Sequence, residues 1–264
     1  MPDLSAVLSD LHAESESLDA LVAPLSEADW DRQTPAEGWT IAYQIAHLAW
    51  TDDTSIKAVT DPEAFAEVVE WATRMPDTFV DSATETLASS QAPSLLLQSW
   101  RTLRAELAEA LAGVPDGTKL PWFGPPMSAT SMATARLMET WAHGQDVADA
   151  LGVVRPPTDR LRHVAHIGVR TRDFAYAVHG EPAPDAPFRV ELAAPSGEQW
   201  AWGPDDAVQR VSGPAHDFCL LVVQRRHRDD LALVAEGPDA DHWLDIAQAF
   251  AGPPGTGRQK GQFA

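Results

Sequence analysis

Acidic and histidine side chains recur on one face of a predicted helix at residues 128–151. At about 100° per residue, Glu139, His143 and Asp146 fall on one stripe of this helix. Apolar residues such as Trp141 occupy the opposite side, so we expect both sides of the helix to be packed. A buried carboxylate and a buried imidazole need a shared cation or a dense hydrogen-bond network. Because positions i and i+4 are neighbours on a helix, Glu139 and His143 have the spacing of two ligands of one metal ion.

A second predicted helix, residues 40–59, offers a third ligand. His47 lies between Tyr43 and Trp50 on a stripe of this helix. Taken alone, it could be a core histidine bonded to a carbonyl, and a Glu–His pair at i, i+4 could equally lie on a solvated face. Taken together, the two imidazoles and one carboxylate form a known ligand set for divalent zinc, nickel or iron, with positions left open for water or substrate. Zinc is the first expectation, and facing helices of a bundle are a usual place for such ligands.

Helical patterns fill the first part of the chain, to about residue 182. Apolar residues at spacings of three and four predict helices at 3–24, 92–113 and 158–179, besides the two that carry the candidate ligands. Another helix is predicted to start at Asp61-Pro62, because proline suits a first helical turn. Residues 114–127 hold several prolines and glycines and are predicted to be a loop.

The pattern changes after a proline-rich linker at 181–187. Alternation predicts a strand at 188–193, and shorter strands are predicted at 198–202, 208–212 and 231–234, with helices at 216–226 and 241–250. We therefore predict an α+β protein with a helical domain at 1–182, a small α+β domain at 183–251 and a disordered tail at 252–264.

Charge and cysteine content exclude several classes of function. The chain carries 19 Lys and Arg against 39 Asp and Glu, a formal charge of −20, which disfavours binding to nucleic acid or to an anionic membrane. No apolar stretch approaches the roughly 20 residues of a membrane-spanning helix, and MPDLSAVLSD is no signal peptide. The single cysteine, Cys219, lies in an apolar run and reads as a core thiol, so a cytoplasmic location is expected.

Two segments carry a resemblance to a known family. EGWTIAYQIAHLAWTD at 37–52 and ETWAHGQDVADALG at 139–152 resemble the DinB-like metalloproteins, and more closely the mycothiol-dependent maleylpyruvate isomerases. SGPAHDFCLLVVQRR and HWLDIAQAF further along resemble the second, sterol-carrier-like domain of that branch. Residues 124–152 also resemble uncharacterised members of the superfamily, some of which carry names that suggest wyosine-base formation.

The resemblance implies a DinB-like four-helix bundle whose metal ligands are His47, Glu139 and His143. It implies that the second domain supplies basic contacts to a thiol or an acid, for which Arg225 and Arg226 are candidates. Asp146 is a candidate for orienting His143 or holding a water at the metal.

The function so implied is a metal-dependent isomerase or thiol transferase that acts on a small molecule with a low-molecular-weight thiol such as mycothiol. Two alternatives stay open: a metal-dependent hydrolase that needs no thiol, and a non-catalytic module that binds metal or lipid. The expected oligomeric state is a monomer or a homodimer.

Overall fold

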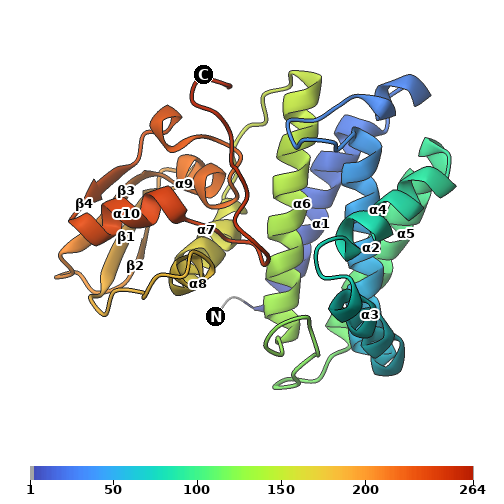
Figure 1. The fold of residues 1–264 in the computed structure, drawn as a ribbon, viewed down its shortest axis with the longest axis horizontal. Coiled ribbons are helices and arrows are strands. Elements are labelled where there is room, and N and C mark those ends of the chain that lie inside the picture. The colour runs from blue at the N-terminus through green and yellow to red at the C-terminus, as the bar shows by residue number, and fades with distance from the viewer. Residues whose placement is uncertain (1–2, 264) are drawn as a thin grey trace. The chain divides into compact units, whose positions relative to one another are not determined.

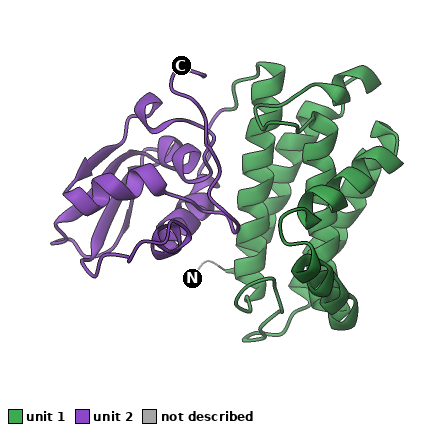
Figure 2. Cartoon of the chain, in the orientation of Figure 1, with its two compact units in different colours: residues 1–155 green, residues 156–264 purple. Residues whose placement is uncertain are grey.

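The computed structural model describes residues 3–263 and divides the chain into two compact units, residues 1–155 and 156–264 (Figure 2). The first unit is helical and the second contains a small sheet with helices, so the protein is α+β, as the sequence predicts. None of the helices within residues 3–263 combines the length and the apolar character that crossing a membrane would require.

The first unit is built on four long helices that pack along one another, α1, α2, α5 and α6 (Figure 1). Two shorter helices, α3 and α4, connect α2 to α5, and a short 3-10 turn, η1, precedes α2. The bounds are α1 Leu4–Val22, η1 Glu27–Asp31, α2 Ile41–Thr60, α3 Pro62–Arg74, α4 Phe79–Ser90, α5 Pro93–Ala112 and α6 Ala129–Leu151.

Local capping explains where the ligand-bearing helices begin and end. The Thr40 side chain accepts a hydrogen bond from the backbone N–H of Tyr43 and so caps α2, and Ser128 caps α6 in the same way. Helix α6 ends at Gly152, whose φ of +68° lies in the left-handed region that favours glycine. The sequence itself offers Thr40 as a plausible cap of the helix predicted at 40–59 and Gly152 as a stop for the helix predicted at 128–151, and both have these roles in the structure.

Buried polar side chains are concentrated between two apolar clusters of the bundle. The first cluster includes Leu18, Ile45 and Trp100, and the second includes Val7, Leu107 and Met132. On α2 the first cluster ends at Ala49 and the second begins at Ala58. On α6 the second cluster ends at Ala133 and the first continues at Val147. Most buried polar residues of α2 and α6 fall between these limits, and we call them the polar layer. They are Asp52, Thr54, Ser55, Thr134, Arg136, Thr140, His143, Gln145 and Asp146.

The second unit is a four-stranded mixed sheet in the order β2-β1-β3-β4 (Figure 1). Strands β1 and β3 are parallel, and the two outer strands pair antiparallel to them. One face of the sheet is buried, and helices α9 and α10 pack on it through Phe218 and Trp243. The bounds are α7 Leu161–Arg170, α8 Arg172–Val178, β1 Phe188–Ala193, β2 Gln199–Trp202, β3 Gln209–Pro214, α9 Ala215–Val222, η2 Arg228–Asp230, β4 Val234–Glu236 and α10 Pro238–Ile246.

The structure differs from the sequence prediction at several places. The strand predicted at 231–234 is β4 at Val234–Glu236, and the helices predicted at 216–226 and 241–250 are α9 at Ala215–Val222 and α10 at Pro238–Ile246. Residues 158–179 form two helices, α7 and α8, because the chain turns at Thr171, whose hydroxyl bonds the carbonyls of Ile167 and Gln248. These helices pack on α9 and α10, so the compact units divide after residue 155, whereas the sequence placed the boundary at 182. Helix α4 was not predicted at all.

Residues 252–263 form neither helix nor strand. Two of them contact η2 of the same unit: Lys260 pairs with Asp229, and the backbone N–H of Gly261 bonds Asp230. The disorder predicted for 252–264 is not tested by these contacts and stays a prediction; residue 264 lies outside the described residues.

Candidate metal centre

Helices α2 and α6 bring together the three side chains that the sequence selected as metal ligands. His47 comes from α2, and Glu139 and His143 come from α6. Both imidazoles are about nine-tenths buried, whereas 24% of the Glu139 side chain is exposed. The carboxylate therefore borders the open side of the cluster, and the expectation that this stripe of α6 faces protein is confirmed for His143.

The ligand atoms of these residues converge on one point. Glu139 Oε2 lies 3.4 Å from His47 Nε2 and 3.2 Å from His143 Nε2, and the three ligand atoms all lie within 4.8 Å of one another. Ligands held at about 2.0–2.1 Å by a tetrahedral zinc ion lie about 3.3–3.4 Å apart. The two measured separations fit such an ion, so the cluster could hold a divalent metal.

The charge of the cluster supports the same conclusion. Withdrawal from water would raise the pKa of Glu139, but hydrogen bonds and charge from His143 and His47 hold the pKa of this carboxyl well below its usual range. Glu139 is thus an ionised ligand at neutral pH. Two nitrogen donors and one anionic oxygen are the ligand types that zinc, nickel and iron accept.

Tryptophans enclose the two imidazoles. Trp39 stacks on His143 with ring centroids 5.7 Å apart and planes inclined by 19°, and it also contacts His47 at 5.3 Å. Trp50 contacts His47 at 6.0 Å. The sequence placed His47 between Tyr43 and Trp50, but Tyr43 packs on Trp39 instead. Trp39 comes from the loop before α2, which no helical pattern covers, so the sequence gives no signal of this contact.

The outer nitrogen of His143 has a polar partner that is not among the residues predicted from the sequence. His143 Nδ1 lies within hydrogen-bond distance of Oε1 of Gln44, one turn before His47 on α2. Gln44 is completely buried. The sequence does contain one signal for this role: Gln44 lies beside Ile41 and Ile45 on the apolar stripe of the helix, where a polar side chain needs a buried partner.

The remaining sequence candidates are not part of the three-residue cluster. Asp146 is completely buried in α6, and its assigned role stays a prediction. Arg225 and Arg226 follow α9 in the second unit, where each donates to a nearby backbone carbonyl and Arg226 covers the ring of Phe263. Their contact with a substrate stays a prediction as well.

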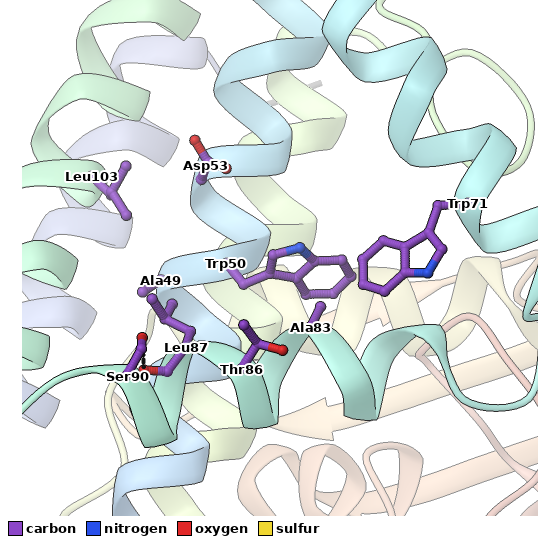
Figure 3. Close-up of a pocket in the computed structure, with 9 residues that line it drawn as sticks. All are labelled: Ala49, Trp50, Asp53, Trp71, Ala83, Thr86, Leu87, Ser90 and Leu103. Carbon is purple, nitrogen blue, oxygen red and sulfur yellow. Dashed lines mark hydrogen bonds between the residues drawn. The ribbon is translucent and has the colours of Figure 1, made fainter.

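A cavity of about 360 Å³ opens beside the metal centre in the first unit (Figure 3). Trp50 lines the cavity and also contacts His47, so this indole connects the cavity wall to the cluster. The close-up draws Trp50 and Trp71 among the lining side chains, and Phe79 contacts both indoles at ring-centroid distances of 5.6 and 6.0 Å. The lining residues are Ala49, Trp50, Asp53, Trp71, Ala83, Thr86, Leu87, Ser90 and Leu103.

The fold and the cluster define a class of protein: a helical bundle that carries a His–Glu–His site, followed by a small mixed α+β unit. Residues 11–148 match the family described as the mycothiol maleylpyruvate isomerase N-terminal domain. This match spans more than half of the 264 residues, and the chain therefore belongs to that family. Residues 184–236 match a second family, described as wyosine base formation.

The chain is also similar to two curated proteins in sequence and to two solved structures in fold. Two proteins of Mycobacterium tuberculosis, from strains CDC 1551 and H37Rv and both named as uncharacterised, are each 59% identical over 258 residues. The alignments cover 98% of this chain and all of each relative. The crystal structure of a mycothiol-dependent maleylpyruvate isomerase has the same fold, with a TM-score of 0.59 and 17% identity over 90% of this chain and 96% of that one. A mutant of that isomerase matches equally well, at 16% identity.

Proposed function

We propose that this protein is a divalent-metal-dependent enzyme that acts on a small molecule with a low-molecular-weight thiol, such as mycothiol, as cosubstrate. The observation that carries the proposal is the convergence of His47 Nε2, His143 Nε2 and a Glu139 oxygen at the separations of ligands to one ion. Family membership supports the thiol, because the solved isomerase of the same fold is described as mycothiol-dependent.

His47, Glu139 and His143 would hold the ion. When bound there, a divalent ion supplies Lewis-acid stabilisation of a deprotonated thiol, the nucleophilic form. The two imidazoles are neutral ligands and Glu139 contributes one negative charge, so the ligand set leaves about one positive charge for an anionic sulfur. Trp39 and Trp50 exclude water from the imidazole side of the cluster.

An activated alkene is the substrate class that suits this chemistry. The sulfur electron pair would form a C–S bond to the alkene carbon, while the π electrons move to a conjugated carbonyl. Return of those electrons after rotation about the former double bond expels the same thiolate and gives an isomer. Protonation of the adjacent carbon instead leaves the thioether of a transferase product. Both outcomes need the thiol, and only the second consumes it.

Metal content and thiol dependence test the proposal. Untagged wild-type protein is expected to hold about one equivalent of zinc, nickel or iron by elemental analysis, and Glu139→Ala and His143→Ala are expected to lose it. His242→Ala is the matched control, because His242 pairs with Glu181 in the second unit. Two results together would support the proposal. The two variants lose the metal, and the wild-type protein turns over activated alkenes only when a thiol is added. Absence of metal in reconstituted wild type would refute it.

Two alternatives make different predictions in the same assays. Thiol-independent turnover by the metal-loaded protein would indicate a hydrolase. A co-purified lipid seen by native mass spectrometry, with no turnover, would indicate a binding module and would support the sterol-carrier resemblance of the second unit. The wyosine match gives no third candidate here, because a formal charge of −20 disfavours contact with nucleic-acid phosphates.

A further inference from the structure

A chain of buried hydrogen bonds leads from His143 away from the metal centre. His143 Nδ1 meets Gln44 Oε1, and Gln44 Nε2 donates to Thr34 Oγ1 over 2.9 Å. The Thr34 hydroxyl in turn donates to the carbonyl oxygen of Trp39 over 2.7 Å. Gln44 is completely buried and Thr34 is 8% exposed, so this relay is a feature of the interior.

The end of the relay determines the direction of every bond in it. The Trp39 carbonyl can only accept, and it already accepts from the backbone N–H of Thr34 at 2.8 Å. The Thr34 hydroxyl proton is therefore used on Trp39, which leaves the Thr34 oxygen as an acceptor for Gln44. Gln44 must then present its amide NH₂ to Thr34 and its carbonyl oxygen to His143. An amide oxygen accepts only, so His143 Nδ1 carries a proton.

We propose that Gln44 and Thr34 are positioning residues that hold the His143 proton on Nδ1, so that Nε2 offers its lone pair to a metal ion. The inference deepens the proposed function and rests on it, since the ion is the reason to keep Nε2 free. A hydrogen bond from the outer nitrogen is how protein sites fix which nitrogen of a histidine binds metal. Here the acceptor of that hydrogen bond is an amide oxygen and not a carboxylate, so the bond adds no negative charge beside the cluster.

Thr34 has its effect without touching His143. A Gln44 amide rotated by 180° would present NH₂ to His143 and would select the tautomer with the proton on Nε2, which cannot bind metal. The Thr34 hydroxyl opposes that rotation, because the rotated amide would aim an oxygen at an acceptor. The loop before α2 thus serves the metal centre twice, through the Trp39 ring and through the Trp39 carbonyl.

Metal affinity of full-length variants tests the relay. Zinc dissociation constants, measured by chelator competition, are expected to rise about 10- to 100-fold in Gln44→Leu and about 10-fold in Thr34→Val, which is the usual range for partners of metal ligands. Thr34→Ser keeps the hydroxyl and should restore near wild-type affinity. In the Gln44→Leu background, Thr34→Val should add nothing. Thr54→Val is the control, because Thr54 is also buried and its hydroxyl donates to a carbonyl of its own helix, that of Trp50.

The tautomer itself gives a readout that does not depend on metal. The Glu139 carboxylate lies 3.2 Å from His143 Nε2 and competes for the proton in metal-free protein, so the measurement uses metal-free Glu139→Ala. With this variant titrated to neutral imidazole, nitrogen NMR should place the His143 proton on Nδ1, and adding Thr34→Val should move it toward Nε2. An Nε2–H tautomer in Glu139→Ala, or an unchanged zinc affinity in Thr34→Val, would overturn the relay. If wild type binds no zinc but Glu139→Ala shows the Nδ1–H tautomer that added Thr34→Val loses, the proposed function fails and the relay stands.

Discussion

The buried ion pair between Asp52 of α2 and Arg136 of α6 gives the sharpest prediction about how the bundle is held together. The Asp52 oxygen and the Arg136 nitrogen are 2.9 Å apart, and the two side chains are 6% and 3% exposed. The pair lies in the polar layer and joins the two helices that supply the metal ligands. Asp52→Asn removes one charge and leaves the guanidinium buried without a counterion.

The expected loss is about 3–5 kcal/mol of unfolding free energy, the usual effect of removing one partner of a buried pair. Single domains have only about 5–15 kcal/mol in total, so this variant should be close to unfolding. Burial raises the pKa of Asp52 even though Arg136 opposes the shift, which means that ionising Asp52 in place costs free energy. Replacing both residues with apolar ones, Asp52→Leu with Arg136→Met, should therefore be nearly neutral or stabilising.

Equilibrium urea unfolding followed by tryptophan fluorescence and circular dichroism measures these differences. Glu70→Gln is the matched control, because Glu70 forms an exposed pair with Arg74 at 3.7 Å and should cost less than about 1 kcal/mol. An Asp52→Asn loss no greater than that of the control would refute the reasoning. A double variant as unstable as the single one would show that packing, and not the unpaired charge, accounts for the loss.

Three further expectations concern other parts of the chain. A hydrogen bond from Arg101 holds the pKa of Asp19 below its usual value. The stabilisation that the ionised Asp19 gives is therefore present above about pH 4 and is lost as the pH falls through the lowered pKa. Asp19→Asn should cost about 1–3 kcal/mol of unfolding free energy at about pH 7 in urea, and progressively less below about pH 4. A Cβ added at Gly168 would lie 2.8 Å from an apolar side chain of α9, so Gly168→Ala should lower stability by about 1–3 kcal/mol. At Gly113 the nearest atom is 3.5 Å from an added Cβ, so Gly113→Ala should stay within about 1 kcal/mol of wild type. Equal thermal unfolding temperatures of the two variants would show that Gly168 is not crowded. Burial raises the pKa of the Cys219 thiol well above its usual range, so the native protein should not react with a disulfide reagent. Cys219→Ser should keep any thiol-dependent turnover. Fast labelling of the native protein would contradict the expected inertness of this thiol.

Elements with a local cause could be predicted from the sequence. Alternation of apolar and polar residues gave strand β1 with the bounds found in the structure, Phe188–Ala193, because one of its faces is buried. Thr40 and Gly152 marked a start and an end of helices through capping chemistry, which depends on neighbouring residues alone. Helix α4 was not predicted because it is rich in serine and threonine, which have low helix propensity, and only two of its residues, Ala83 and Thr84, are buried.

The candidate metal centre divides in the same way. The proximity of Glu139 and His143 follows from four residues of helical rise, so the sequence alone determined that half of the site. That His47 joins them depends on how α2 packs against α6, across 92 residues of chain. The residue types offered His47 as a third ligand and the family resemblance agreed, but neither determines the distance between the helices. The orientation of Gln44 was decided only by the folded loop, because the Trp39 carbonyl that directs the relay is held by its hydrogen bonds with Thr34, which the residue types alone do not specify. Periodicity and capping act over a few residues, whereas the directions of buried hydrogen bonds and the partners of buried charges exist only once separate helices meet.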